Sequence, residues 1–205
     1  MTGRSLGRIW QPVVALALAA ACSTADGEKS IAEYDRETGR LRRLTVDVNG
    51  NGRNDTVSHM DGTRIDRIEL DLDENGRLDR WDFYRTDRTL ESVGFSRFND
   101  GVMDARAFYG AGAKVARIEL STGRDGRFNK VEFYEAGLLV RGEEDTNGDG
   151  RADKWETYAA NPGAAPNEPP FSITSVAFDD SGRGVPQRRV IYDRGGRAVR
   201  TETHP

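Results

Sequence analysis

DTNGDGRADKWE, Asp145 to Glu156, is a stretch that recurs in altered form along the whole chain. Side chains with oxygen atoms stand at its positions 1, 3, 5, 9 and 12, and Gly150 at position 6 permits a sharp turn. Calcium in proteins binds about six to eight oxygen ligands at about 2.3 to 2.6 Å. The stretch therefore predicts a calcium loop, with ligands from Asp145, Asn147, Asp149, the carbonyl of Arg151, Asp153 and Glu156.

The ninth position of this loop recurs at a nearly constant interval. Successive copies, at Asp55, Asp79, Asp104, Asn129 and Asp153, are 24, 25, 25 and 24 residues apart. Such spacing indicates an internal repeat. Each unit closes on an aromatic residue or on methionine, at Met60, Tyr84, Tyr109, Tyr134 and Tyr158. We expect five repeats over 34–160, a proline-rich loop over 161–170, and a degenerate sixth repeat with a C-terminal strand over 171–205.

The segments between the loops predict strands. Apolar residues alternate with polar ones there, as at Ile68 and Leu70 before one loop and Trp81 and Phe83 after it. Alternation bounded by Asn, Asp and Gly is typical of half-buried strands. The sequence therefore predicts an all-β fold, an antiparallel meander of about 13 short strands made of 24–25-residue hairpin repeats. Alternation fixes the faces of the strands but not closure, so the sheet can stay open and elongated, curl onto itself or split into stacked sheets.

Two other loops keep much of the ligand pattern. The remaining copies have lost ligands, and we interpret them as plain turns, because turns of any kind favour Asn, Asp and Gly. We rank the loop at 145–156 first for calcium, then the second copy and then the first, with a modest affinity near 10⁻⁴ to 10⁻³ M. The candidate ligands are Asp71, Asp73, Asn75, Asp79 and Asp82 in the second copy, and Asp47, Asn49, Asn51 and Asp55 in the first.

The beginning of the chain carries an export signal. Arg4 and Arg8 precede an apolar run, and the small residues 19–21 stand directly before Cys22. These features predict a signal peptide over 1–21. The segment before Cys22 resembles a bacterial lipoprotein lipobox, which implies a lipid on Cys22 and a membrane anchor; an ordinary cleavage site is the alternative. We expect a lipidated N-terminus and flexible tether over 22–33, and Ser23 favours the outer membrane of the cell envelope.

The composition predicts a thin or elongated fold. Only 36% of the residues are hydrophobic and 31% are charged. Without residues 1–21, the chain has 28 basic and 34 acidic residues, a net charge of −6 in place of −4. Acidic residues clustered at turns suit divalent cations, and nothing indicates nucleic-acid binding. Cys22 is the single cysteine, so no intrachain disulfide can form, and bound calcium is the candidate for stabilising the sheet.

The loop at 145–156 resembles the loop of an EF-hand by its spacing. An EF-hand is flanked by helices, whereas strands flank this loop, so the opening of an EF-hand does not carry over. The region from Tyr34 to Tyr158 resembles bacterial tandem repeats of the form Asp-x-Asn-x-Asp-Gly-x-x-Asp, found in secreted proteins and lipoproteins. Tyr34-Asp35 and Tyr192-Asp193 resemble the Tyr-Asp turns of bacterial shell proteins. Neither resemblance implies an enzymatic activity.

The sequence offers little for catalysis. His59 and His204 are the only histidines, and there is no Gly-x-Ser-x-Gly motif, zinc-spaced histidine pair or phosphate loop. We favour a non-catalytic scaffold, or a surface that binds a cell-surface protein or polysaccharide. The alternatives are a calcium-dependent hydrolase of envelope or extracellular glycans and a metal-free repeat spacer. We expect the repeated Trp and Tyr residues to pack across strands, and the arginines of Arg67-Ile68-Glu69 and Arg117-Ile118-Glu119 to form ion pairs on a solvated face.

Overall fold

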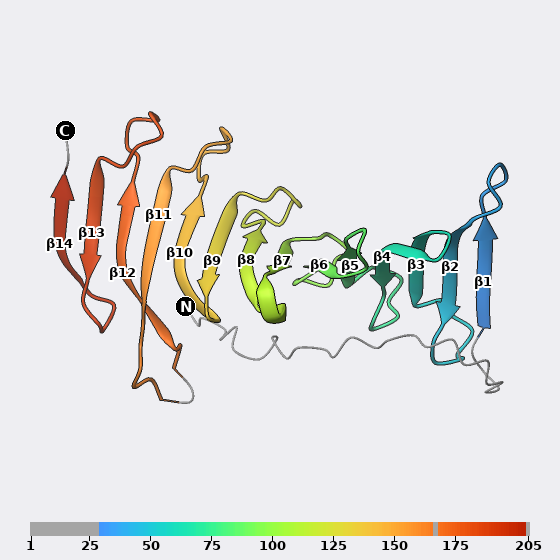
Figure 1. Ribbon diagram of the computed structural model, residues 1–205. Helices are drawn as coiled ribbons and strands as arrows, with labels where there is room; N and C mark the ends of the chain where they lie inside the picture. Colours follow the sequence, from blue (N-terminus) through green and yellow to red (C-terminus); the bar gives the residue numbers. More distant parts are fainter. Residues whose placement is uncertain (1–28, 166–167, 204–205) are drawn as a thin grey trace.

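The computed structural model describes residues 29–165 and 168–203. These residues form 14 strands that pair in chain order within one antiparallel sheet (Figure 1). Strands β1 and β14 lie at opposite ends of the sheet, which is open. The predicted all-β meander is therefore confirmed, and of the alternatives for its closure the elongated open sheet is the one found.

The strands are short, and a single turn of 3₁₀ helix, η1 (Ala111–Ala113), lies between two of them. Their bounds are β1 Lys29–Tyr34, β2 Leu41–Asp47, β3 Thr56–Asp61, β4 Arg64–Leu70, β5 Arg80–Tyr84, β6 Leu90–Phe95, β7 Ala105–Tyr109, β8 Val115–Leu120, β9 Lys130–Glu135, β10 Leu138–Glu144, β11 Lys154–Ala160, β12 Phe171–Phe178, β13 Arg188–Tyr192 and β14 Ala198–Thr203.

Strand β1 is the strand that the predicted count of about 13 lacks. It overlaps residues 29–33 of the predicted tether, so that part of the prediction differs from the structure. The cause is the turn after it, in which Gly39 donates its N–H to the carbonyl of Asp35 at 2.9 Å and folds β1 back onto β2. The predicted signal peptide, Cys22 and the tether up to residue 28 lie outside the described residues.

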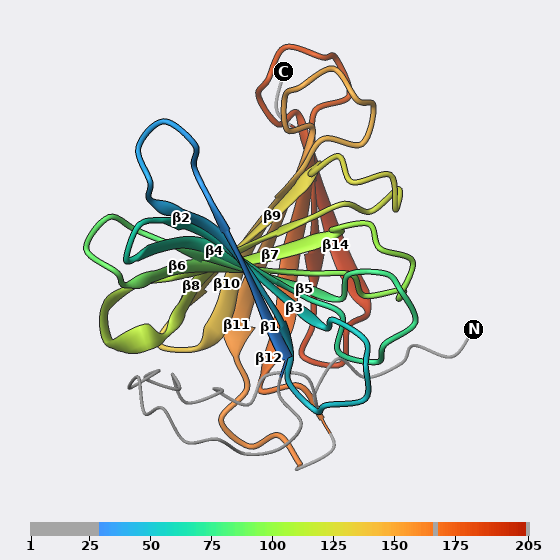
Figure 2. The ribbon, with the colours of Figure 1, turned by 90° about the vertical axis from the view of Figure 1, so that its right-hand side faces the viewer.

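The closing residue of each repeat marks an irregularity in the sheet. The pairing register shifts beside Tyr34, which precedes the first repeat, and beside the closing residues Met60, Tyr84, Tyr109, Tyr134, Tyr158 and Tyr192. Bulges of this kind increase the right-handed twist of a strand pair, which is already roughly 20° per pair in ordinary sheets. The strands accordingly fan out around a common axis when viewed along the sheet (Figure 2).

One face of the sheet holds most of the buried apolar residues. It carries Tyr84, Tyr109, Tyr134 and Tyr158, and we call it the tyrosine face. Val93, Ala107, Ile118 and Val176 lie on it in one row of directly opposed residues, each at most 4% exposed. Between Ile118 and Val176 the same row contains Glu132, Gly142 and Glu156, so apolar residues meet across strands on both sides of a polar stretch.

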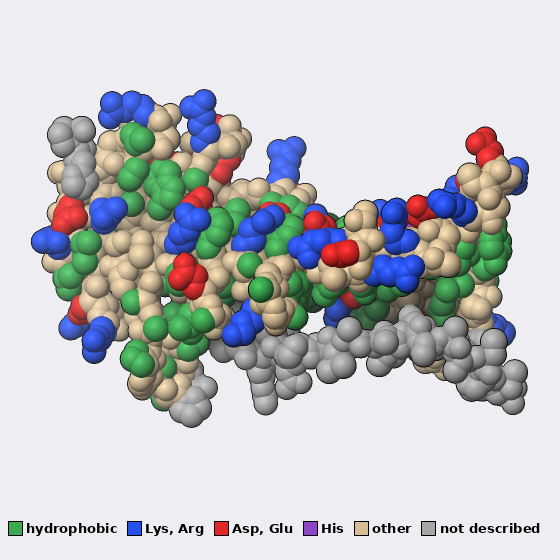
Figure 3. Space-filling model, viewed as in Figure 1, with side chains coloured by type: hydrophobic (Ala, Val, Ile, Leu, Met, Phe, Trp, Pro, Cys, Tyr) green, Lys and Arg blue, Asp and Glu red, His purple; other side chains and the backbone are tan. Residues whose placement is uncertain are grey.

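The other face, which we call the arginine face, combines ion pairs with aromatic contacts. The predicted pairs are present, with Arg67 Nε 2.8 Å from Glu69 and Arg117 3.1 Å from Glu119. The guanidinium group of Arg117 also lies 3.7 Å from the ring centroid of Phe108. Arginine, acidic and hydrophobic side chains alternate over the surface of the molecule (Figure 3). Cation–π contacts of this kind contribute about 0.5 to 1 kcal/mol each at exposed sites.

The sheet is a single layer within the described ranges. Each strand packs mainly against the strand before it and the strand after it. The described residues include no helix long and apolar enough to cross a membrane. The stability of the fold therefore depends on cross-strand pairs and on the loops that join the strands.

Candidate functional site: a row of repeat loops

Six loops with the repeat pattern lie at the same end of the strands. We number these repeat loops 1 to 6 in chain order, and they join β2 to β3, β4 to β5, β6 to β7, β8 to β9, β10 to β11 and β12 to β13. Because the sheet twists, the row of loops winds around the molecule, from the bottom of the view beside β2 and β3 to the top beside β12 and β13 (Figure 1). Their first and ninth positions span 47–55, 71–79, 96–104, 121–129, 145–153 and 179–187.

Repeat loops 1, 2 and 5 fold through the same set of local hydrogen bonds. In repeat loop 2 the Asp71 carboxylate accepts the N–H of Gly76 at 2.8 Å, and the Asp79 carboxylate accepts the N–H of Leu72 at 2.6 Å. The Asn75 side chain accepts the N–H of Arg77 at 2.8 Å. The same contacts recur in repeat loops 1 and 5. Positions 1, 5 and 9 thus shape the turn itself, and Gly76 supplies the positive φ of 85° that the turn requires.

Backbone bonds join each repeat loop to the next. The N–H at position 1 donates to the carbonyl at position 9 of the preceding loop, as from Asp71 to Asp55 at 2.9 Å and from Asp145 to Asn129 at 2.8 Å. The same bond is made by Ser96, Ser121 and Asp179. The six loops therefore form one hydrogen-bonded row, and an event that stiffens one loop acts directly on its neighbours.

Repeat loop 2 holds the arrangement of acidic groups that best suits a bound cation. Asp71, Asp73 and Asp79 each offer a carboxylate oxygen, and these oxygens all lie within 4.8 Å of one another. Two ligands on opposite sides of a calcium ion are about 4.6 to 5.2 Å apart, from bond lengths of about 2.3 to 2.6 Å. Among the described residues, it is the one group of three or more Asp, Glu, His or Cys side chains whose ligand atoms lie this close together. Carboxylates alone favour a hard cation such as calcium or magnesium.

A residue from the neighbouring loop supports this cluster. Asn99 of repeat loop 3 donates its side-chain N–H to Asp73 at 2.5 Å. This hydrogen bond, together with others from within the loop, holds the pKa of Asp73 below its ordinary value, so the carboxylate stays ionised at neutral pH. Asn99 is not among the predicted ligands, although its offset of 26 residues from Asp73 is close to the repeat length and is a signal for contact between adjacent loops.

In repeat loop 1 two candidate ligands are drawn toward the next loop. The side-chain amides of Asn49 and Asn51 both donate to the carboxylate of Glu74, which lies in repeat loop 2. Glu74 was not a candidate residue, and it sits at a positive φ of 57°. Asp47 is only 2% exposed and accepts three backbone N–H groups of its own loop. Asp55 accepts the N–H of Val48, so loop 1 is well satisfied by its own contacts.

Repeat loop 5, ranked first by ligand count, is arranged differently from loop 2. The hydroxyl of Thr146 lies 2.8 and 2.9 Å from the two carboxylate oxygens of Asp153. Position 2 of loop 2 is Leu72, which has no hydroxyl, so Asp79 keeps an oxygen for the cluster. Asp145, Asn147 and Asp149 each accept backbone N–H groups within the loop, and Arg151 contributes the N–H bonded to Asp149. The geometry therefore favours loop 2 over loop 5.

The two candidates for position 12 lie on the tyrosine face of the sheet, away from the loops. Glu156 is 7% exposed, with Oε2 2.6 Å from Lys130 Nζ and Oε1 2.8 Å from Lys154 Nζ. Asp82 pairs with Arg80 at 2.6 Å. The cause is the strand geometry, because position 12 falls three residues after position 9 and its side chain stands perpendicular to the sheet. Strands, unlike the helix after an EF-hand loop, do not bring this residue back over the loop.

Acid pH is expected to destabilise the fold through Glu156. Although burial favours the neutral form, hydrogen bonds from Lys130 and Lys154 lower the pKa of Glu156 to about 2. A depressed carboxyl pKa contributes stability above the ordinary value and loses it as the pH falls toward the folded value. We therefore expect about 3 kcal/mol of this contribution to disappear between about pH 5 and pH 2. Urea unfolding across this range checks the result, and a Glu156→Gln variant should show a shallower decline; equal slopes would contradict it.

In repeat loop 3 the side chain of Arg97 supplies a positive charge within the loop. Asp104 at position 9 is 1% exposed, and its Oδ1 accepts from the backbone N–H of Arg97 at 3.1 Å and from the guanidinium Nε at 2.9 Å. Arg97 also donates to the carbonyl of Ser121, in the next loop, at 3.3 Å. The positive charge of Arg97 thus lies against the carboxylate at position 9 of this loop. This supports the interpretation of the third copy as a turn.

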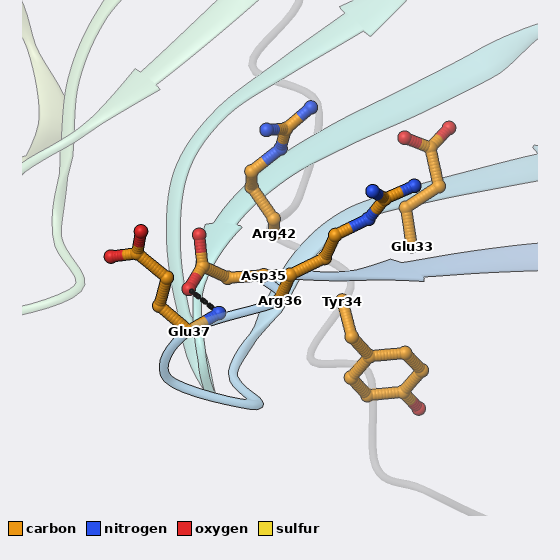
Figure 4. A pocket seen from close by; sticks show the side chains of 6 residues that line it. All are labelled: Glu33, Tyr34, Asp35, Arg36, Glu37 and Arg42. Atoms are coloured by element: carbon orange, nitrogen blue, oxygen red, sulfur yellow. Dashed lines mark hydrogen bonds between the residues drawn. The ribbon is translucent and has the colours of Figure 1, made fainter.

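A separate hollow of about 540 Å³ lies beside the turn between β1 and β2 (Figure 4). This turn is at the other end of the strands from the repeat loops. Asp35 lines the hollow, and its carboxylate accepts the N–H of Thr38 at 2.8 Å and that of Glu37 at 3.1 Å. These bonds hold the pKa of Asp35 below its ordinary value. Asp35 thus caps its own turn.

Comparison with known proteins adds little about function. The chain matches no protein-family model and no curated protein. A crystal structure of accessory secretory proteins 1, 2 and 3 in Streptococcus pneumoniae contains a chain that is similar to part of this one, with 17% identity and a TM-score of 0.37. The similarity covers 51% of this chain and 19% of that chain, about a fifth of its length. At this level of similarity it carries no functional argument.

Proposed function

We propose that this chain is an exported, lipid-anchored β-repeat protein that binds calcium in its repeat loops and works as a non-catalytic scaffold or binding surface. The observation that carries the calcium proposal is the cluster of Asp71, Asp73 and Asp79, whose oxygens fit around one hard cation. Three carboxylates at this distance repel one another unless a cation neutralises them. Calcium there would supply charge neutralisation and rigidity, with Asn75 as a further oxygen donor.

The row of loops supports a structural role for the ion. Asp71 donates its N–H to Asp55 in the preceding loop, and Ser96 in the following loop donates to Asp79. A cation held by Asp71 and Asp79 therefore fixes two residues that bond to both neighbouring loops. In a single-layer sheet, stiffening this edge opposes the separation of strands.

The long, continuous faces of the sheet support the scaffold role. The arginine face presents ion pairs and cation–π contacts over several strands, such as Arg141 with Glu143 at 2.6 Å and with Phe133 at 3.8 Å. The charged side chains there are paired within the sheet, as in a solvated surface. We propose a cell-surface protein or polysaccharide as the partner of this face, and a lipid on Cys22 as the anchor in the cell envelope.

Thermal unfolding with and without calcium tests the proposal. The chain from Ser23 to Pro205, which contains every described strand, would be stripped with chelator and unfolded with added calcium or magnesium. Binding to the folded state alone raises its stability by about 2.7 kcal/mol at a hundredfold excess over Kd. We expect a rise in Tm that is larger for calcium than for magnesium.

Variants assign the rise to a loop. A chain with Asp71→Asn and Asp79→Asn should lose the calcium-dependent rise, while Asp100→Asn, an exposed aspartate of repeat loop 3, should keep it. A chain with Asp145→Ala and Asp149→Ala tests repeat loop 5 in the same way. If the unaltered chain shows no calcium-dependent shift, the calcium proposal fails.

A further inference from the structure

The two edge strands of the sheet are open to further pairing. Within the described residues, β1 pairs only with β2 and β14 only with β13. Natural sheets usually blunt such edges with proline, bulges or inward-pointing charges, because unpaired N–H and C=O groups recruit another strand. Neither β1 nor β14 contains proline, and the register shift of each edge pair is confined to one end of it, at Tyr34 and at Tyr192. Both edges expose large apolar side chains: Ile31 is 54%, Tyr34 63% and Val199 60% exposed.

We propose that the chain assembles head to tail, with β14 of one copy pairing antiparallel with β1 of a second copy. Each strand of the meander is antiparallel to the one before it, so the first and last of 14 strands also run in opposite directions. A second copy can therefore continue the sheet with the alternation of strand directions unbroken. The proposal does not rest on calcium binding.

The pairing register of the sheet identifies which residues would meet. One row of opposed residues runs from Glu33 and Arg43 in β1 and β2 to Ile191 and Arg200 in β13 and β14. Continuing the row places Arg200 of one copy opposite Glu33 of the next. The next matching row on the same face places Glu202 opposite Ile31, with Lys29 diagonal to Glu202. Opposite charges directly across an antiparallel pair stabilise it.

The contacts already made by these charges leave them accessible to a partner. Arg200 lies 2.5 Å from Glu202 on its own strand, and its side chain is 67% exposed. Glu33 lies 3.5 Å from Arg43 and its side chain is 44% exposed. Pairing between copies would bring Arg200 and Glu202 of one copy beside Glu33 and Lys29 of the next. These four charges would form ion pairs like those on the arginine face.

Proline substitutions can block each edge separately. Asp71 donates its N–H to Asp55 across the β3–β4 pair, and hydrogen-bonded positions alternate along an antiparallel ladder. Through the continuous rows, this alternation directs the backbone N–H of Ala32 in β1 and of Thr201 in β14 toward the free edges. Proline is tolerated on an edge strand where the N–H faces solvent. Ala32→Pro and Thr201→Pro therefore block one edge each and keep the existing strand pairs.

Sedimentation velocity of the chain from Ser23 to Pro205, in chelator, tests the assembly. The unaltered chain should show a mass that rises with concentration beyond a dimer. Each proline variant alone should stay monomeric, and an equimolar mixture of the two should form a dimer and nothing larger, because one open β14 then meets one open β1. Thermal unfolding of each variant confirms that it remains folded.

Charge reversal tests the register. Arg200→Glu alone and Glu33→Arg alone should each weaken association at least tenfold, and the chain with both changes should regain it. The proposal is overturned if the unaltered chain is monomeric from micromolar to millimolar concentration, or if either proline variant alone forms dimers, since that shows pairing between like edges. Because chelator is present throughout, failure here leaves the calcium proposal intact, and failure of calcium binding leaves this one intact.

Discussion

Replacing Glu156 with alanine is expected to lower the free energy of unfolding by about 3 kcal/mol, because it removes the carboxylate that two half-buried lysines share. The side chains of Lys130 and Lys154 are only 14% and 25% exposed. Lys154 keeps Glu144 at 3.0 Å and Lys130 keeps Glu132 at 3.8 Å, so each lysine loses the shorter of its two contacts. Breaking a buried ion pair typically costs about 3 to 5 kcal/mol, and the remaining contacts place this loss at the lower end. Tyr158 also loses the acceptor of its hydroxyl, which lies 2.9 Å from Glu156.

The surroundings of Glu156 make this effect specific. Gly142 lies directly opposite it in β10, and a Cβ there would come within 2.8 Å of Glu156 Oε2. The glycine thus makes room for the carboxylate and the lysines. Urea unfolding at neutral pH measures the change, with Glu156→Gln as the isosteric control that keeps the volume and two hydrogen-bonding groups. A loss below about 1 kcal/mol for alanine, the range of a surface pair, would contradict this account of the tyrosine face.

Replacing Asp104 with alanine should lower the free energy of unfolding by a similar amount, about 3 kcal/mol, for the same reason. Asp104 is 1% exposed and holds both the backbone and the guanidinium group of Arg97. Arg97 connects repeat loop 3 to Ser121, so the effect reaches repeat loop 4. Unlike a change in repeat loop 2, this destabilisation should be the same with and without calcium.

Comparison with Asp79 makes that test sharper, because Asp79 and Asp104 both occupy position 9. We expect Asp79→Ala to destabilise the chain more in calcium than in chelator, and Asp104→Ala to do so equally in both. Chemical unfolding of both variants, in calcium and in chelator, gives the four free energies of unfolding that this comparison needs. A calcium-dependent penalty at Asp104 would show that Arg97 does not replace the cation.

Much of the fold follows from local patterns. The alternation at Ile68 and Leu70, the glycine at position 6 and the regular spacing from Asp55 to Asp153 predict hairpins of known length and faces of known polarity. The ion pairs of Arg67-Ile68-Glu69 also follow from alternation, since residues two apart share a face. Strand β1 cannot be predicted from alternation, because the residues around it are polar. Only the turn at Asp35 indicates that a strand precedes it.

The candidate site was harder to predict, because its decisive contacts join different repeats. The bonds from Asn99 to Asp73 and from Asn51 to Glu74 depend on how adjacent loops stack, which a ligand count within one loop does not include. Thr146 changes the ranking of loop 5 through its own hydroxyl. Glu156 matches the EF-hand spacing in sequence, but a strand carries it onto the tyrosine face.

A calcium titration followed by NMR tests whether repeat loop 2 binds calcium. The N–H of Gly76 donates to Asp71 at 2.8 Å, so its amide signal reports on the cluster. The amide of Gly184, at the same position in the distant repeat loop 6, is the internal control. We predict a saturable shift of the Gly76 signal, with a Kd near 10⁻⁴ to 10⁻³ M, and little change at Gly184. A Gly76 signal that stays in place at saturating calcium would contradict it.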